Sequence, residues 1–438
     1  MDTDKIYKGN LYEFKVKNWI KNGGNGEVYE VNILNSSIAD SCVVKVLSLN
    51  KWWGAKKKER YERFYKEIET VMFLQENIPG IMKILDFHCP KEIQNDYEVW
   101  YLMYKARSFR EFIANKKGDL RIKLKYLLNL SNILCALHDR GYSHRDIKID
   151  NLLILDNELM LSDFGLVHNI NDEINITGEN ERLGPYYIGP RELERRDLNM
   201  NDFMASDVFL FAKVVWSVLK NDTMGFRGAY KRDNKEFYLN ALDYGITTFE
   251  PVHQLLEQST QMDMLKRISI QKCKELLSEQ LLTINQPKSE KAKVYRFNEV
   301  KMEIVNNNQP DLRVYRNFDK IFTILDAIIA VSHMVIEGAD ELISADSIQK
   351  WRVNDRAFVL KNTSKSVVTH SYLCYPDYIE YSTDKEDIKL YIKAVSREVI
   401  HSDFISYKER KMAMWGGINS NIFLDETLVI RFKSDNKK

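Results

Sequence analysis

Two short polar segments set among apolar residues constrain this chain more than any other feature of its sequence. Residues 144–151 read HRDIKIDN and residues 163–165 read DFG, and apolar residues 152–154 directly follow the first segment. The two segments carry a carboxylate that can accept a hydroxyl proton, carboxylate and amide oxygens that suit Mg²⁺, and a lysine that can approach phosphate. Solvated turn residues are the structural alternative, but the joint pattern favours phosphoryl transfer.

A glycine cluster and an embedded lysine lie upstream. Residues 23–26 read GGNG and stand between two segments of alternating apolar and polar residues. Glycines allow a tight strand–turn–strand to present bare backbone N–H groups to phosphate, although most such clusters are only hairpin turns. Lys45 lies in the apolar run VVKV, where a buried ammonium needs an anionic partner. Glu67 on the next predicted helix is the candidate partner; an ordinary surface pair is the alternative.

The hydrophobic periodicity predicts how the elements are arranged. Residues 11–104 are expected to be rich in strands and interrupted by one helix at 56–74, with Tyr61, Phe64, Ile68, Val71 and Met72 on its apolar face. Further helices are predicted at 120–139 and at 206–219, the latter buried. The polar segment 284–293 is the predicted linker. Beyond it we expect a strand at 294–297, a long helix near 318–337 and a final strand at 427–432.

The composition argues against several classes of protein, namely nucleic-acid-binding, membrane, disulfide-rich, zinc-binding and secreted proteins. The formal net charge is +1, so no overall field favours nucleic acid or an acidic membrane as a partner. Five cysteines lack CxxC spacing, which argues against a disulfide framework or a zinc site and favours a reducing compartment. The N-terminal sequence MDTDKIYKGN lacks the apolar core of a secretory signal, and the most apolar segment, 321–336, is too polar to span a membrane. We therefore expect a cytoplasmic protein.

On these motifs, the sequence resembles the eukaryotic-like serine/threonine protein kinases from about residue 11 to residue 283. The resemblance implies an α+β, bilobal protein-kinase fold with a strand-rich N-lobe (1–103) and a helical C-lobe (104–283). After the linker, residues 294–438 are expected to form a C-terminal α+β domain. The resemblance does not extend to that domain, for which a targeting or sensing role is an expectation.

The resemblance also implies site roles. Asp146 would be the catalytic base, Lys148 would lie beside the γ-phosphate of ATP, and Asn151 and Asp163 would hold Mg²⁺. Lys45, tied to Glu67, would bind the α- and β-phosphates. The other positions implied to bind ATP, which include the glycine loop and the hinge after the gatekeeper Met103, are Gly23, Gly24, Gly26, Val28, Val43, Met103, Tyr104, Ala106 and Leu153.

Substrate class and regulation follow from the same resemblance. Lysine two places after Asp146 is the serine/threonine pattern of the family, so the expected partners are proteins phosphorylated on Ser or Thr, including this chain itself. Arg145 marks the type often regulated through the activation loop. Thr177 is the only Ser or Thr between Gly165 and Pro190, and its phosphate could pair with Arg145. A threonine that is never modified is the alternative.

The sequence departs from the family pattern in places. Lys21 replaces the first glycine of the phosphate loop, and Val43 replaces a smaller residue beside the adenine site. The family's A-P-E motif reads GPRE at 189–192, so that Arg191 occupies the position of a glutamate that normally pairs with a late arginine, here Arg267. Two buried guanidinium groups would repel, and we expect Glu192 to form the pair instead.

Two other readings remain open at this stage. A non-catalytic scaffold on the kinase fold would predict damage at Lys45, Asp146 or Asp163, but all three are present. A small-molecule phosphotransferase of related fold would typically lack the long loop before residue 190 and the buried helix that begins SDV at 206–208.

Overall fold

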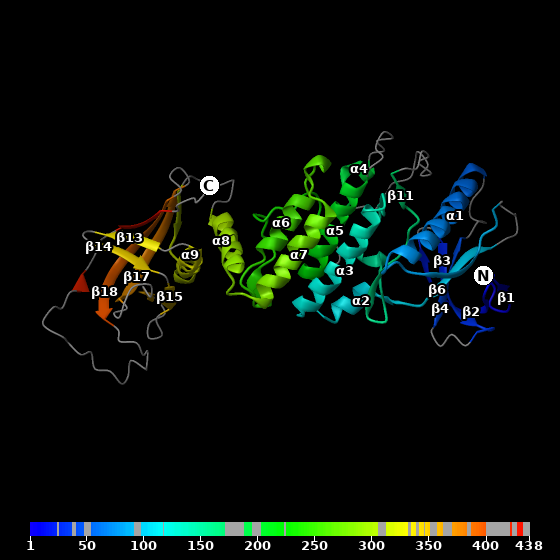
Figure 1. The fold of residues 1–438 in the computed structure, drawn as a ribbon, viewed down its shortest axis with the longest axis horizontal. Coiled ribbons are helices and arrows are strands. Elements are labelled where there is room, and N and C mark those ends of the chain that lie inside the picture. Colours follow the sequence, from blue (N-terminus) through cyan, green and yellow to red (C-terminus); the bar gives the residue numbers. More distant parts are fainter. Residues whose placement is uncertain are drawn as a thin grey trace. The chain divides into compact units, whose positions relative to one another are not determined.

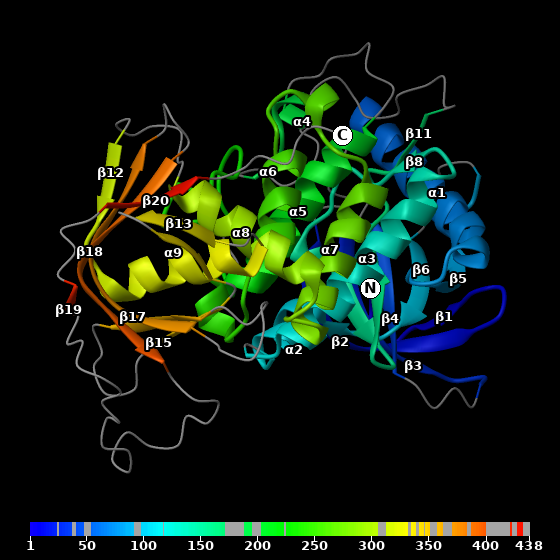
Figure 2. The ribbon, with the colours of Figure 1, turned by 60° about the vertical axis from the view of Figure 1, so that its left-hand side comes forward.

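The chain forms two compact units in its computed structural model: Met1–Asn240 with Pro251–Leu281, and Ala241–Glu250 with Leu282–Lys438. Figures 1 and 2 show the elements of each unit. The structure describes residues 1–23, 26–36, 41–47, 54–91, 98–116, 118–170, 188–194, 203–222, 225–304, 312–331, 334–338, 341–345, 347–350, 357–361, 370–382, 387–399, 421–422 and 427–431.

The first unit begins with a six-stranded sheet of order β1-β2-β3-β4-β6-β5. Its core combines aromatic and β-branched residues, among them Phe14, Val44 and Trp100. The pairing register places Lys45 opposite Val28 on one side and opposite Tyr101 on the other. The strands are β1 (Ile6–Lys8), β2 (Glu13–Gly23), β3 (Gly26–Ile33), β4 (Cys42–Leu47), β5 (Ile84–His88) and β6 (Val99–Tyr104).

The predicted helix in this region is α1 (Gly54–Asn77). Tyr61, Phe64, Ile68 and Val71 are buried, as predicted, because steps of three and four residues keep them on one face. The prediction is wrong for Met72, which is 37% exposed. It follows Val71 directly and therefore points about a quarter turn away from the buried face.

The helical part of the first unit confirms the predicted helices at 120–139 and 206–219, which are α3 and α5. Figures 1 and 2 both show α3, α5 and α7 side by side. The elements are β7 (Arg107–Ser108), α2 (Phe109–Ala114), α3 (Leu120–His138), β8 (Tyr142–Ser143), the 3₁₀ helix η2 (Ile149–Asn151), β9 (Leu152–Leu155), β10 (Glu158–Leu161), β11 (His168–Asn169), α4 (Arg191–Glu194), α5 (Met204–Lys220), α6 (Glu250–Ser259), the 3₁₀ helix η4 (Met264–Lys266) and α7 (Ile270–Asn285).

Helix α5 is buried along nearly its whole length, as its apolar sequence predicts. It ends at Lys220, and Asn221, which caps it, has a φ of 58° in the left-handed region that Asn tolerates well. The Nζ of Lys123 on α3 donates to Asn221 Oδ1 at 2.7 Å and ties the two helices together. Asp207 near the start of α5 is fully buried and reaches the active-site loop.

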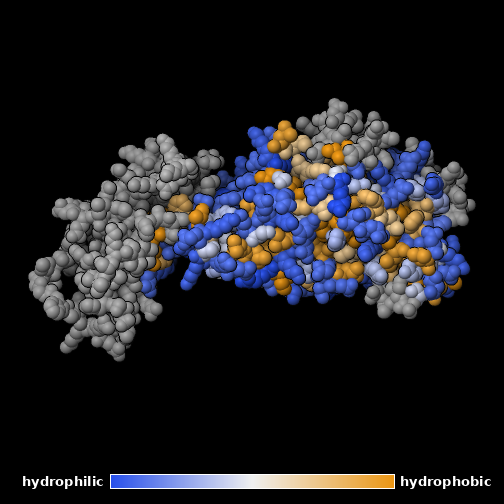
Figure 3. All heavy atoms as spheres, viewed as in Figure 1, coloured by the Kyte–Doolittle hydropathy of each residue, from blue (hydrophilic) through white to orange (hydrophobic). Residues whose placement is uncertain are grey.

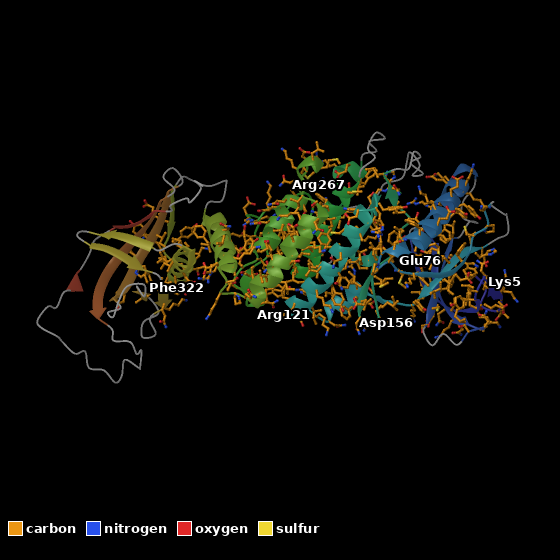
Figure 4. All side chains as sticks on the ribbon, viewed as in Figure 1. Lys5, Glu76, Arg121, Asp156, Arg267 and Phe322 are labelled. Carbon is orange, nitrogen blue, oxygen red and sulfur yellow. The ribbon has the colours of Figure 1, made fainter. Side chains whose placement is uncertain are left out.

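The described part of the second unit combines the helices α8 (Glu290–Ile304) and α9 (Phe318–Val331) with a nine-stranded sheet. Phe322 on α9 is labelled in Figure 4. The sheet order is β14-β13-β20-β18-β17-β16-β15, with β12 on β17 and β19 on β18. Its strands are β12 (Leu312–Tyr315), β13 (Met334–Gly338), β14 (Glu341–Ala345), β15 (Ser347–Lys350), β16 (Phe358–Lys361), β17 (His370–Ser382), β18 (Asp387–Val399), β19 (Asn421–Ile422) and β20 (Thr427–Arg431).

The strand predicted at 294–297 is wrong, because these residues belong to α8. Ser289 caps this helix: its Oγ accepts from Ala292 N at 3.3 Å, and its carbonyl oxygen accepts from Lys293 N at 3.1 Å. An ion pair of 2.7 Å between Arg296 and Asp326 joins α8 to α9. Of the predicted linker 284–293, only 286–289 lie between α7 and α8.

The helix predicted near 318–337 is too long. It ends at Val331, and residues 334–338 form β13, which pairs with β14 in a register that places Ile336 opposite Ile343. A continuous apolar run does not distinguish a helix from a buried strand, which explains the error. The predicted final strand at 427–432 is confirmed as β20.

The described residues include no helix that is long and apolar enough to cross a membrane. On the face in Figure 3, hydrophobic residues of the first unit lie in several separate places among hydrophilic ones. The predicted fold class, a strand-rich N-lobe and a helical C-lobe followed by an α+β region, is confirmed.

Candidate active site

A buried lysine and two carboxylates form the centre of the site. Lys45 in the middle of β4 places its Nζ 2.8 Å from Glu67 Oε1 on α1 and 3.1 Å from Asp163 Oδ1. Both Lys45 and Glu67 are almost fully buried, whereas the side chain of Asp163 is 36% exposed. The structure therefore brings together three residues that the sequence separates widely.

The opposite charges of this cluster stabilise the ionised forms of Lys45 and Asp163. Burial disfavours the Lys45 ammonium, but Asp163 and Glu67 outweigh it and hold the pKa of Lys45 well above its usual value. The Lys45 charge lowers the pKa of Asp163 to about 2 despite the opposing effect of burial. Both side chains are therefore charged at neutral pH.

The loop 144–151 gathers a second set of side chains around Asp146. Lys148 Nζ donates to Asp146 Oδ2 at 2.7 Å, and Asn151 Nδ2 donates to the same oxygen at 2.9 Å and to the Asp146 carbonyl at 2.8 Å. Asp146 is only 7% exposed, and its orientation is fixed from two sides. A carboxylate held in this way can act as a positioned hydrogen-bond acceptor.

Asp207 at the base of the site holds the backbone of this loop. Its oxygens accept from His144 N at 2.6 Å and from Arg145 N at 2.7 Å. Because the helix α5 that carries Asp207 is buried along nearly its whole length, the loop is anchored to the core of the unit. The sequence pattern identified the start of α5 but did not assign this role to Asp207.

Two residues of the site have strained backbone conformations. Arg145 has a φ of 63° and Asp163 a φ of 65°, in the left-handed region that non-glycine residues rarely occupy. Hydrogen bonds stabilise both: Arg145 Nε donates to Leu166 O at 2.5 Å in addition to its backbone bond, and Asp163 pairs with Lys45. Such strain is typical of functional sites, where surrounding contacts fix the backbone.

Helix α1 and the region after Asp163 are connected by a further contact. Arg63, one turn before Glu67, donates from Nε to the Gly165 carbonyl at 2.6 Å. The ring of Phe164 is buried against His144, with the centroids 4.8 Å apart. Arg63 belongs to none of the sequence motifs described above, so this contact was not predicted.

The other residues that are predicted to bind nucleotide and that the structure describes lie on β2, β3, β4, β6 and β9, apart from Ala106, which follows β6. Val43 is opposite Met103 in the register of β4 and β6, and Val43 is buried. Gly23 ends β2, Gly26 and Val28 lie on β3, Tyr104 ends β6 with Ala106 two residues later, and Leu153 lies on β9. Gly24 and Thr177 lie outside the described residues.

Position 26 requires glycine for a structural reason that is independent of phosphate binding. A Cβ at this position would lie 2.3 Å from the backbone oxygen of Val46 on β4, a distance no real Cβ tolerates. Glycine is therefore required for the close approach of β3 to β4, which carries Lys45.

Gly26→Ala is expected to destabilise the protein by about 1–3 kcal/mol, the usual cost of overpacking. Thermal unfolding of the purified chain measures this loss. Gly118→Ala is the matched control, because a Cβ there would have no neighbour within 4 Å among the residues that the structure describes, and a negligible change is expected. Equal stability of the two variants would contradict the packing argument.

The expected pair between Glu192 and Arg267 is present. Glu192 Oε1 contacts Arg267 Nη1 in a very short ion pair, and Arg267 Nη2 lies 3.3 Å from Glu192 Oε2. Arg267 is 1% exposed and Glu192 is 11% exposed, whereas the neighbouring Arg191 is exposed. Figure 4 labels Arg267 among the helices of the first unit.

The donor set near Asp163 fits Mg²⁺. The hard cation prefers one or two carboxylates and completes its shell with water and phosphate oxygens. Asp163 would supply a carboxylate oxygen, and Asn151 would supply its amide oxygen, since its Nδ2 is engaged with Asp146. The described residues contain no cluster of three or more His, Cys, Asp or Glu that would hold a metal without the nucleotide.

Comparison with known families agrees with this geometry. Residues 14–281 match the protein kinase domain family. The match covers more than half of the 438 residues, and the chain belongs to this family.

Several curated proteins are similar to parts of the chain. Receptor-interacting serine/threonine-protein kinase 1 of Homo sapiens is 29% identical over 27% of this chain and 19% of its own length. Dual specificity protein kinase Ttk of Danio rerio is 25% identical over 41% of this chain and 17% of its own length. Aurora kinase of Schizosaccharomyces pombe is 29% identical over 47% of this chain and 57% of its own length. The chain therefore spans less than two thirds of each of these relatives.

Proposed function

We propose that this chain is a protein kinase that transfers the γ-phosphate of ATP to Ser or Thr hydroxyls of proteins. The observation that carries the proposal is the arrangement of two charged clusters, Asp146 with Lys148 and Asn151, and Lys45 with Glu67 and Asp163. The first provides an acceptor for a hydroxyl proton and the second provides a cation for phosphate oxygens.

On the acceptor side, Asp146 orients the substrate hydroxyl and takes its proton as the oxygen–phosphorus bond forms. The bond between the γ-phosphorus and the bridging oxygen of ADP breaks in the same displacement. Lys148 donates to Asp146 Oδ2 at 2.7 Å, and its ammonium would offset the charge of the transferring group.

On the nucleotide side, Lys45 binds the α- and β-phosphates, and Glu67 fixes the position of its ammonium. Backbone N–H groups of the loop at 23–26 cover the phosphates, and the hinge at 104–106 holds adenine beside Val43 and Met103. Mg²⁺, held by Asp163 and Asn151, supplies charge neutralisation on the phosphates when it is bound.

Two alternatives are less well supported. A non-catalytic scaffold does not need the buried ion pair of Lys45 and Glu67, because a buried charge is costly even when it is paired. A small-molecule phosphotransferase does not need a platform for a protein substrate. We place this substrate platform in the segment that follows the activation loop and leads into α4, which the pair of Glu192 and Arg267 anchors. We further propose that residues 294–438 target substrates or sense a signal, and that a phosphate on Thr177, added by the kinase itself, pairs with Arg145.

Incubation of the purified chain with Mg²⁺, labelled ATP and a generic basic protein tests the residue class. Lys148 in the serine/threonine pattern leads us to expect label in phosphoserine and phosphothreonine after acid hydrolysis. One relative carries the name dual specificity protein kinase, so the label in phosphoserine and phosphothreonine should be compared with the label in phosphotyrosine. Mainly phosphotyrosine would overturn the Ser/Thr assignment but not the kinase assignment.

A further inference from the structure

A tyrosine on β6 shares the carboxylate oxygen that Lys45 uses. Tyr101 is directly opposite Lys45 in the register of β4 and β6. Its hydroxyl donates to Glu67 Oε1 at 2.9 Å, and Lys45 Nζ donates to the same oxygen at 2.8 Å. Two donors from two strands therefore converge on one atom of α1.

The ring of Tyr101 contacts the same two elements. It is 5% exposed and stacks on Phe64 of α1, with the centroids 5.4 Å apart and an angle of 27° between the planes. Lys45 Nζ lies 5.4 Å from the ring centroid, within the range of a cation–π interaction. Tyr101 thus touches α1, Glu67 and Lys45 together.

Glu67 depends on these donors more than an ordinary carboxylate does. It is 2% exposed, and its Oε2 is buried without a hydrogen-bond partner among the residues that the structure describes. Burying a carboxylate is costly unless it is hydrogen-bonded, so the two hydrogen bonds to Oε1 must compensate for the burial of the Glu67 carboxylate. Burial raises the pKa of Tyr101 well above its usual value, which keeps the hydroxyl a donor.

From this geometry we infer that Tyr101 is a positioning residue that holds Glu67, and with it α1, in the place where Lys45 can bind phosphate. The expected loss of kcat/KM rests on the proposed phosphotransfer. The expected loss of nucleotide affinity does not require phosphotransfer and is therefore an independent test. Tyr101 belongs to no sequence motif, but it lies within the apolar run VWYLMY, where a buried hydroxyl requires a partner.

Tyr101→Phe tests the inference because it keeps the ring and removes only the hydroxyl. We expect a loss of about tenfold in kcat/KM for ATP, equivalent to about 1.4 kcal/mol, and a several-fold weaker affinity for Mg·ADP by calorimetry. Tyr126→Phe is the matched control. Tyr126 on α3 is also 5% exposed and donates to Asn157 O at 3.0 Å, away from the site. Loss of the Tyr126 hydroxyl should lower the stability of the protein to a similar extent as Tyr101→Phe. It should leave kcat/KM for ATP and the affinity for Mg·ADP unchanged.

A double-mutant cycle separates positioning through Glu67 from general packing. In a Glu67→Ala background the acceptor is absent, so Tyr101→Phe should cause little further loss. Full activity of Tyr101→Phe, the same kinetic loss in Tyr126→Phe, or an undiminished effect in the Glu67→Ala background would overturn the inference. If Glu67→Ala does not fold, the comparison of the two Tyr→Phe variants decides alone.

The same variants distinguish failure of this inference from failure of the proposed function. A wild-type chain that binds Mg·ADP but transfers no phosphate would contradict the kinase proposal, while the Mg·ADP affinities would still decide on Tyr101. An active wild type with unaffected Tyr101→Phe would contradict only the positioning role.

Discussion

Asp146→Asn is expected to lower kcat by about 10²–10⁴-fold, the usual contribution of a general base, with Mg·ATP affinity nearly unchanged. The substitution removes the proton acceptor but keeps the side-chain shape and the backbone bond from Asn151 Nδ2 to the residue 146 carbonyl. The phosphate cradle around Lys45 is not touched. Steady-state phosphorylation together with nucleotide titration measures both quantities.

Asp163→Ala is the informative comparison, because Asp163 pairs with Lys45 at 3.1 Å and supplies the carboxylate suited to Mg²⁺. It should weaken Mg²⁺-dependent nucleotide binding itself. A thermal-shift titration in which Asp146→Asn loses nucleotide and Asp163→Ala retains it would reverse the two roles.

Glu192→Ala is expected to destabilise the first unit by about 3 kcal/mol, the lower end of the range for breaking a buried pair. Arg267 would keep its bonds to Gln261 O at 2.8 Å and Ala205 O at 3.0 Å, which limits the loss. At roughly 2–4 °C per kcal/mol, the melting temperature should fall by about 6–12 °C. Activity should fall as well, because α4 follows the proposed substrate platform.

Arg191→Ala is the control for this prediction. Arg191 is adjacent in sequence but exposed, and surface substitutions usually change stability by less than about 0.5 kcal/mol. Differential scanning fluorimetry of the two variants in parallel separates them. Equal melting temperatures would mean that the ion pair contributes nothing to the anchoring of α4.

The sequence predicted the first unit well because its signals are local or tied to strict periodicity. The helices α1 and α3 follow from spacings of three and four residues, and α5 follows from its nearly continuous apolar sequence. Lys45 within an apolar strand indicated that the ammonium needs an anionic partner. The replacement of a glutamate by Arg191 indicated that Glu192 would pair with Arg267, since like charges cannot share a buried site.

The errors and omissions have physical causes as well. Residues 294–297 have strand propensity, but the cap at Ser289 and the contact of α8 with α9 stabilise a helix there. Tyr101 and Asp207 act through strand register and helix burial, which bring distant residues together and leave no motif of their own. Tertiary contacts of this kind cannot be read from spacing.

Transfer of labelled γ-phosphate from ATP to a protein hydroxyl, compared between wild type and Asp146→Asn at equal nucleotide occupancy, tests whether this chain is a protein kinase with Asp146 as its base. We expect label on Ser or Thr with the wild-type chain and a signal lower by at least about 10²-fold with the variant. Equal labelling by both proteins, or no labelling by a wild-type chain that binds Mg·ATP, would contradict it.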